Sequence, residues 1–246
     1  SSLAPIPEQL EQAKYILGEK GRNARYIAYF QENTNTYGPV SRLEPLFRAA
    51  MEPEDVVALS VATRPDCLGP DSLAMLARLR AVKPVWVELG LQTIHEATAA
   101  RIRRGYPLSV FDEAVRDLHT IGIEVIVHLI LGLPGETAAD MEASSRYVGR
   151  CGAAGVKLHL LHILHGTPMA AEYAAGRVRT LELDEYITLL ERCLEVLPPE
   201  VAIHRLTGDA PKRDLIAPLW SADKKRVLNA IRQRFESDDL IQGSKL

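Results

Sequence analysis

The sequence predicts an α/β fold in which parallel strands and covering helices form a partial (β/α)6 barrel. Short apolar, β-branched runs alternate with longer amphipathic stretches along the 246 residues, and no segment repeats another closely enough to suggest a solenoid. The runs VVALSV, VWVEL and VIVHLIL lack strict apolar–polar alternation, as expected for parallel strands covered on both faces. Polar residues gather at the ends and inner faces of successive strands: Gln31, Asn33, Thr63, Arg64, Glu88, Gln92, His128, His159 and His162.

The elements begin with a helix and then alternate. Amphipathic periodicity predicts helices over residues 8–19, 43–51, 70–82, 94–103, 108–121 and 138–153. The apolar runs between them predict strands over residues 25–31, 55–62, 85–91, 124–131 and 156–163. Repeated right-handed crossovers of this kind build either an open doubly wound sheet or a barrel. We favour the barrel, because polar strand ends meet at one mouth only if the sheet is strongly curved or closed.

The pattern changes after the strand at 156–163. A helix over residues 183–197 ends at the break Pro198-Pro199, a short strand follows over 201–206, and a final helix covers 224–236. We therefore divide the chain into a barrel over residues 1–180 and a C-terminal α/β extension over residues 181–246 that packs on it.

The composition is that of a folded protein and argues against several classes of protein. Hydrophobic residues make up 47% and charged residues 25% of the chain, which argues against disorder. The formal net charge of -3 gives no global basic field, so it does not call for nucleic acid, although a local basic patch stays open. Cys67, Cys151 and Cys193 are odd in number and far apart, which argues against a disulfide framework and favours the cytoplasm. No apolar run is long enough to span a bilayer, and the start, SSLAPIPEQLEQ, does not read as a targeting segment.

The segment VELGLQT, followed by IRRGY, carries polar side chains in and after an apolar strand. Glu88 lies inside that strand, and a buried carboxylate is costly unless it is paired or used. A structural pair with an interior Arg or Lys and a role in a site explain it about equally well. Gln92 at the strand end suits a ribose hydroxyl, and the guanidinium of Arg104 matches a carboxylate. Either residue alone is a weak signal.

The segment HLILGLPGET runs from a strand through a turn with two glycines into a helix. Glycines let the backbone approach a ligand, and free N–H groups at a helix start favour anionic or hydroxyl-bearing ligands. An ordinary turn before a capped helix is the simpler interpretation of the same residues. His128, inside the strand, is by the same standard more often a hydrogen-bonded core residue than a catalyst.

In KLHLLHILHGTPM, histidines recur at His159, His162 and His165. Strand alternation would put His159 and His165 on one face and His162 on the other, and no Cys or carboxylate stands nearby at ligand spacing, so a zinc site is disfavoured. In SVATRPDCL, Arg64 and Asp66 are expected to form a local salt bridge and turn cap.

Together and in this order, the segments resemble the radical S-adenosylmethionine (radical SAM) superfamily. They are most similar to its YhcC-like family, which is related to the Elongator catalytic subunit and to oxygen-independent coproporphyrinogen oxidase. The resemblance runs from about residue 8 to the C-terminus, through YIAYFQENTNTY, ATRPDCL, VELGLQT, IRRGY, HLILGLPGE, VKLHLLHILHGTPM, PPEVAIHRL and IAPLW.

The resemblance implies a TIM-like partial barrel and an enzyme that uses S-adenosylmethionine (SAM) and a four-iron four-sulfur (4Fe-4S) cluster. Such enzymes cleave SAM reductively to a 5′-deoxyadenosyl radical, which abstracts hydrogen from a substrate that this sequence does not identify. An electron donor such as flavodoxin or ferredoxin is implied as a partner, and a membrane is not.

The resemblance also implies cofactor-binding residues. Gln31 and Asn33 would lie where the family holds the SAM amino group. Gln92 would contact the ribose and Arg104 the SAM carboxylate.

Further residues of the implied site follow on later strands. His128 would replace a ribose-contacting polar residue, His162 would flank the adenine through its backbone, and Glu88 belongs to the same cofactor-binding set. The turn beside the adenine would consist of Gly132, Leu133, Pro134, Gly135 and Glu136.

The chain departs from the family in three places. Phe30, Gln31 and Glu32 replace a Gly-Gly-Glu-like strand end, and Ala62 replaces a glutamate of the Elongator subunit before Thr-Arg-Pro-Asp. The three cysteines belong to separate elements and cannot form the cluster-binding triad, so we expect no metal ligand in this chain. We interpret this departure as a missing first strand with its cluster loop, which predicts that the segment alone is inactive.

Two other hypotheses stay open. A cluster-less relative would be a non-enzymatic module that binds SAM or a nucleotide. An unrelated barrel lyase such as an aldolase would carry a lysine at a strand end facing the mouth, whereas Lys157 lies near a strand start. Kinship with the Elongator subunit hints at RNA as a substrate, which the acidic chain does not support.

Overall fold

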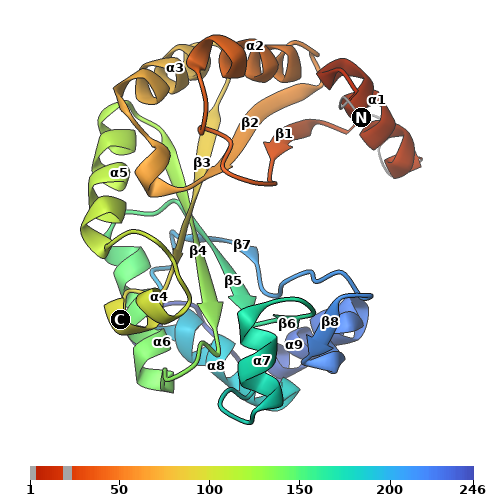
Figure 1. The fold of residues 1–246 in the computed structure, drawn as a ribbon, viewed down its shortest axis with the longest axis vertical. Helices are drawn as coiled ribbons and strands as arrows, with labels where there is room; N and C mark the ends of the chain where they lie inside the picture. The colour runs from red at the N-terminus through yellow and green to blue at the C-terminus, as the bar shows by residue number, and fades with distance from the viewer. Residues whose placement is uncertain (1–3, 19–23) are drawn as a thin grey trace. The chain divides into compact units, whose positions relative to one another are not determined.

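The computed structural model describes residues 4–18 and 24–246, in which helices and strands alternate from an initial helix (Figure 1). The helices are α1 (Ile6–Leu17), α2 (Val40–Met51), α3 (Pro70–Arg80), α4 (Glu96–Arg101), α5 (Leu108–Thr120), α6 (Ala138–Arg150), α7 (Pro168–Ala174), α8 (Leu183–Glu195) and α9 (Lys224–Ser237), with short 3-10 helices η2 (Pro65–Cys67) and η3 (Leu219–Ala222). The strands are β1 (Tyr26–Phe30), β2 (Val56–Thr63), β3 (Val85–Gln92), β4 (Glu124–Leu131), β5 (Gly155–Leu160), β6 (Ile163–Leu164), β7 (Ala202–Arg205) and β8 (Leu215–Ala217).

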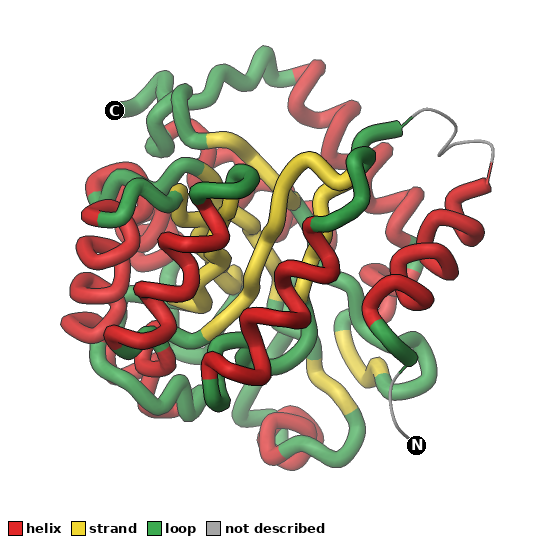
Figure 2. Tube along the Cα trace, turned by 90° about the horizontal axis from the view of Figure 1, so that it is seen from above, coloured by secondary structure: helices red, strands yellow, loops and turns green. Residues whose placement is uncertain are grey.

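Across the described residues, six strands belong to one sheet with the order β1-β2-β3-β4-β5-β7, and β6 pairs with β8 in a small antiparallel sheet. Figure 2 distinguishes the strands, in yellow, from the helices, in red. The chain divides into two compact units. The first consists of Ser1–Gly90 and Ser109–Val125, and the second of Leu91–Leu108 and Ile126–Leu246.

In the first unit, β1, β2 and β3 are parallel neighbours, and Ser60 of β2 stands opposite Tyr29 of β1 and Trp86 of β3. Every residue of β2 except Val57 is buried. Helix α2 packs against β2 and against α3, and so contributes to this burial (Figure 1). The largest buried side chains of this unit are Phe47, Leu59, Met75, Leu76, Leu79, Leu89, Phe111, Leu118 and Ile123.

In the second unit, β4, β5 and β7 are parallel neighbours, and one row of the register contains His128, Lys157 and Arg205. Helices α6 and α8 pack against each other. Tyr186 of α8 is fully buried, and its hydroxyl donates to the carbonyl oxygen of Leu206 at 2.9 Å. This bond fixes α8 to the segment that follows β7.

A smaller apolar cluster lies beside the antiparallel pair of the second unit. Ile163 of β6 stands opposite Ala217 of β8, and both are buried together with Val178. Helix α9 packs against α8 and η3 and buries Val227 and Ile231. This small core thus combines residues from before and after β7.

The predicted strands agree with the structure to within a residue or two, apart from the strand over 156–163. β4 has the predicted bounds, Glu124–Leu131. β5 ends at Leu160, and Ile163–Leu164 form β6, which pairs with β8 instead of prolonging β5. The prediction is wrong here because the apolar run continues without a break, while the pairing that divides it is made with a distant segment.

The predicted helices also occur, with shifted ends. The helix expected over 94–103 is shortened to Glu96–Arg101, and the first expected helix extends to residue 19, which lies outside the described residues. Helix α7 was not predicted; it begins after Thr167, whose side chain accepts a hydrogen bond from the backbone N–H of Ala170. No helix in the described part of the chain is long and apolar enough to cross a membrane. The boundary at residue 180 stays a prediction.

Candidate functional site

The loop after β1 is tied to the end of β2 in the first unit. The Asn35 side-chain amide donates to the carbonyl oxygens of Phe30 at 2.9 Å and Ala62 at 2.8 Å. The hydroxyls of Thr36 and Thr63 form a buried hydrogen bond of 2.6 Å. These bonds satisfy backbone acceptors at both strand ends and hold the polar loop over them.

A cavity of about 590 Å³ opens beside this loop. Asn33 lines it and has a left-handed backbone with φ 64°. Arg64 and Asp66 also line it and form a bidentate pair with distances of 2.9 and 2.7 Å, which confirms the predicted local salt bridge. Hydrogen bonds from Arg64 hold the pKa of the Asp66 carboxyl below its usual value. Gln31 is exposed directly after β1. The other lining residues are Thr34, Tyr37 and Cys67.

Glu88 lies buried in β3, with 4% of its surface exposed. The hydroxyl of Tyr29 on β1 donates to its Oε2 at 2.7 Å, and the hydroxyl of Ser60 on β2 donates to its Oε1 at 2.9 Å. Both carboxylate oxygens are therefore hydrogen-bonded from neighbouring strands. Sequence reasoning missed Tyr29, although the aligned strands put it opposite Ser60.

Gln92, the last residue of β3, is half-buried and has a left-handed backbone with φ 66°. The next residue, Thr93, is buried and donates through its hydroxyl to Oε1 of Glu136 at 2.5 Å. Burial raises the pKa of the Glu136 carboxyl, and the hydrogen bond from Thr93 opposes that rise. The structure thus connects the end of β3 to the turn after β4, two segments that were predicted separately.

Arg104 is buried, and each of its N–H groups points to an acceptor within the protein. Nη1 donates to the carbonyl oxygens of Thr93 at 2.6 Å and Leu91 at 3.2 Å. Nε donates to the carbonyl oxygen of Tyr106 at 3.0 Å, and Nη2 lies 3.3 Å from both carboxylate oxygens of Glu96. The guanidinium therefore holds the backbone on both sides of residue 92. A further carboxylate could reach it only by displacing Glu96.

The turn from Gly132 to Glu136 has the glycine-dependent geometry that its sequence indicates. Gly132 and Gly135 have φ of 82° and 92°, which favour glycine. Thr137 then starts α6 with a capping box to Asp140. Residues Arg177, Val178, Arg179 and Leu181 lie against the turn and line, with it, a cavity of about 170 Å³. Sequence reasoning gave no sign of this second segment.

The rings of His128 and His159 are neighbours, with centroids 5.4 Å apart and planes tilted by 35°. His162 lies close to the same place, since a Cβ on Gly208 would come 2.7 Å from its Cε1 and 3.5 Å from Nδ1 of His159. The expectation that His162 faces away from His159 is therefore wrong, because β5 ends at Leu160 and alternation does not continue through the following turn.

His162 and His159 differ in their polar contacts. Nε2 of His162 lies 3.1 Å from the hydroxyl of Ser221. Burial lowers the pKa of His159 to about 3, and neighbouring positive charge at His128 and Arg205 contributes. His159 is thus a neutral imidazole at physiological pH.

The three cysteines lie in separate elements: Cys67 in η2, Cys151 after α6 and Cys193 in α8. Burial raises the pKa of the Cys193 thiol to about 12, which favours the protonated form that does not bind metal. Within residues 4–18 and 24–246, no group of three or more His, Cys, Asp or Glu side chains is placed to hold a metal ion. The donor set of this chain therefore does not fit a 4Fe-4S cluster.

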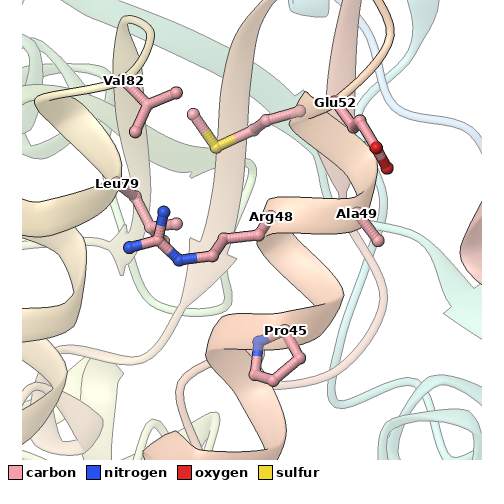
Figure 3. A pocket seen from close by; sticks show the side chains of 7 residues that line it. Pro45, Arg48, Ala49, Glu52, Leu79 and Val82 are labelled. Carbon is pink, nitrogen blue, oxygen red and sulfur yellow. The ribbon is translucent and has the colours of Figure 1, made fainter.

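Another cavity, of about 450 Å³, lies between helices α2 and α3 of the first unit (Figure 3). Arg48 lines it and pairs with Glu44, and hydrogen bonds from Arg78 and Arg48 lower the pKa of the Glu44 carboxyl to about 2. None of the predicted site residues lines this cavity. Its lining residues are Pro45, Arg48, Ala49, Met51, Glu52, Leu79 and Val82.

Comparison with known proteins gives consistent matches along the chain. The family model described as the radical SAM superfamily matches residues 4–148, and the model of the radical SAM C-terminal domain matches residues 153–237. Protein YtqA of Bacillus subtilis is 43% identical over 235 residues, which cover 96% of this chain and 73% of YtqA. Protein YhcC of Escherichia coli is 36% identical over 242 residues, which cover 98% of this chain and 77% of YhcC.

A solved structure supports the architecture. Elp3 of the archaeon Methanocaldococcus infernus, with an N-terminal deletion, superposes with a TM-score of 0.81 over 96% of this chain and 59% of its own length, at 18% identity. This likeness confirms the predicted α/β partial barrel.

Proposed function

This chain belongs to the radical SAM superfamily and is a homologue of YhcC and YtqA, and we propose that it supplies the SAM-facing part of an enzyme. In a form that also carries a cysteine triad, the enzyme would cleave SAM reductively to a 5′-deoxyadenosyl radical that abstracts hydrogen from its substrate. An electron donor such as flavodoxin or ferredoxin would be its partner. Because the described residues offer no cluster ligands, the role we propose for them is to bind and orient SAM.

The observation that carries this proposal is the backbone of Gln92. A non-glycine residue in the left-handed region costs on the order of 1–3 kcal/mol and persists where the surroundings hold it and function uses it. Arg104 stabilises this conformation of Gln92 by donating hydrogen bonds to the carbonyl oxygens of Leu91 and Thr93. The half-buried amide of Gln92 can donate and accept at once, as a ribose hydroxyl pair requires.

Other residues fit the same role. Asn33 has a second left-handed backbone, at the cavity beside β1 and β2, and with Gln31 it is our candidate for the SAM amino group. In the turn at 132–136, Gly135 leaves its backbone open to a planar base. His128 is our candidate for the contact to the ribose. Arg104 would either bind the SAM carboxylate after Glu96 is displaced, or favour SAM binding indirectly by positioning Gln92.

SAM binding is the first experiment. Isothermal calorimetry should show about tenfold weaker SAM binding for Gln92→Ala, because a hydrogen-bonding amide is lost from a half-buried site. Gln92→Gly should weaken binding equally while relieving the backbone cost, so it separates loss of the amide from loss of stability. Gln233→Ala, on the exposed face of α9, is the control. Unchanged affinity in both Gln92 variants would refute the assignment.

A cluster-less binding module is the second candidate, favoured by the absence of a cluster ligand set among the described residues. Both candidates bind SAM, so turnover separates them. Anaerobically reconstituted full-length protein with dithionite should form 5′-deoxyadenosine if the enzyme proposal holds. SAM binding by protein that takes up no cluster under these conditions and forms no 5′-deoxyadenosine would favour the module. Adding metabolite and RNA pools to the same assay would identify the substrate class by stimulated 5′-deoxyadenosine formation.

A further inference from the structure

A group of basic side chains covers one face of the β4, β5 and β7 strands in the second unit. His128, Lys157 and Arg205 share one row of the register, and side chains of paired neighbours project to the same face. His159 lies two residues after Lys157 and therefore on that face as well. We call His128, Lys157, His159, His162 and Arg205 the basic cluster; its members come from three strands and the turn after β5.

His159 is the member whose hydrogen bonding is incomplete. Its Nε2 atom is buried and has no hydrogen-bond partner among the described residues. Its Nδ1 atom faces Gly208, and its ring lies next to the ring of His128 at a tilt of 35°. A buried ring nitrogen without a partner costs roughly 1–3 kcal/mol, so such an atom calls for an explanation.

The position of these rings depends on the absence of a side chain at residue 208. Gly208 is buried, and a Cβ there would come 2.7 Å from Cε1 of His162. No real Cβ tolerates that distance, so alanine at this position would displace the His162 ring. Gly208 thus allows both histidine rings to lie against the same piece of backbone.

The charges around His159 determine which kind of ligand could lie next to its Nε2 atom. Arg205 and Lys157 are positive, and they add to burial in disfavouring a proton on His159. Asp209 supplies negative charge, but it is engaged with Lys224 at 2.8 Å and with Arg205 at 3.5 Å. A cation at this place would be repelled, whereas a negatively charged oxygen would be attracted and could accept a hydrogen bond from Nε2.

We propose that the basic cluster is a binding subsite for an anionic group, a carboxylate or a phosphate, of the substrate, with Nε2–H of His159 donating to it. That the anion belongs to the substrate rests on the proposed function, since His128 is a candidate SAM contact and its ring is the neighbour of the His159 ring. The subsite would hold the substrate beside the bound SAM. Binding of an anion itself needs neither SAM nor a cluster.

The test is an NMR titration of the histidine side chains. Long-range proton–nitrogen spectra of the ¹⁵N-labelled protein report the imidazole nitrogens, and His159 is assigned by its absence in His159→Gln. Sodium phosphate and sodium acetate are titrated separately at constant ionic strength, balanced with chloride. We expect a saturable shift of the His159 nitrogens with one anion or both, and the stronger binder distinguishes a phosphate from a carboxylate subsite.

Variants link the shift to the cluster. Gly208→Ala should weaken anion binding about tenfold, because its Cβ displaces the His162 ring and the anion then loses one member of the basic cluster. His165→Gln removes an exposed histidine six residues away from His159 and should leave the shift unchanged. A folded wild-type protein whose His159 signals do not move, or move linearly with both anions, would overturn the proposal. So would Gly208→Ala binding as tightly as the wild type. An unresponsive His159 would then have an internal water as its partner. None of these outcomes bears on SAM binding by Gln92.

Discussion

Glu88 in the first unit and His159 in the second are both enclosed, titratable side chains on strands of a parallel sheet, yet their contacts differ. Both oxygens of Glu88 accept hydroxyl hydrogen bonds, from Tyr29 and Ser60, whereas Nε2 of His159 has no partner among the described residues. Hydrogen bonds from β1 and β2 therefore fix the orientation of the Glu88 carboxylate. The imidazole has been left with unused hydrogen-bonding capacity, which is the signature we interpret as a ligand position.

Arg104 resembles Glu88 because its polar atoms are hydrogen-bonded within the protein. Its substitution should reduce stability more than any other substitution considered. Arg104→Ala would remove the side-chain donor from the carbonyl oxygens of Thr93 and Tyr106, while the carbonyl oxygen of Leu91 would keep only the backbone N–H of Thr93. We expect the free energy of unfolding in urea to fall by about 3–5 kcal/mol and SAM binding to weaken as well. Arg103→Ala replaces the exposed neighbour and should change stability by less than about 0.5 kcal/mol. Equal effects of the two substitutions would show that the carbonyl contacts of Arg104 contribute little.

Lowering the pH should destabilise the protein through the buried His159. Its pKa in the folded protein is about 3, against an ordinary value of 6.5. The native state therefore binds fewer protons than the unfolded state, and stability that is present above pH 6.5 is lost as the pH falls toward 3. Between pH 6.5 and 5, the wild type should lose about 1.5 kcal/mol more than His159→Leu. Parallel stability–pH curves would contradict this, and phosphate or acetate must be kept out of the buffers.

Tyr29→Phe should have a smaller effect on the other side of the comparison. It removes one of the two hydroxyl donors to Glu88, from a partly exposed tyrosine, so we expect a loss of about 1 kcal/mol. Tyr37→Phe makes the same chemical change on a side chain that is 80% exposed and should be neutral. The measurement is the midpoint of urea unfolding, with a constant m value. A neutral Tyr29→Phe would show that Ser60 alone suffices for Glu88.

His159→Leu at pH 7.5 should give the smallest effect of all. Because Nε2 makes no hydrogen bond within the described protein, replacing the ring by an apolar group of similar size should leave stability within about 0.5 kcal/mol or raise it. A loss above about 2 kcal/mol would indicate that the ring nitrogens already have partners. The same variant should fail to bind the anion, which separates stability from binding.

Much of the fold was predictable from the sequence, and the reasons are local. The run EVIVHLIL is strongly apolar and is flanked by Gly122 and Gly132, so the bounds of β4 follow directly. The end of β5 could not be predicted, because it depends on Ile163 pairing with Ala217 across a long stretch of chain. The same misplaced end produced the wrong orientation of His162.

The site was less predictable because its contacts are made by the backbone and across strands. Sequence reasoning chose Gln92 and Arg104 for their side-chain chemistry, yet Arg104 contacts carbonyl oxygens, which every residue possesses. The left-handed backbone of Gln92 has no sequence signal of its own, since glycine is the usual indicator of that conformation. The hydroxyl of Tyr29 becomes relevant only once β1 and β2 are aligned.

The hydrogen bond between Thr93 and Glu136 has a consequence for the evolution of the family. The two residues are 43 positions apart in the chain, and each supplies what the other lacks: a hydroxyl donor and a half-buried carboxylate acceptor. Loss of either removes this bond and leaves its partner with fewer contacts, the N–H of His95 for the Thr93 hydroxyl and Thr98 for Glu136, so the two positions are coupled. In an alignment of homologues, positions 93 and 136 should covary, and a relative without threonine at 93 should carry a compensating change at 136.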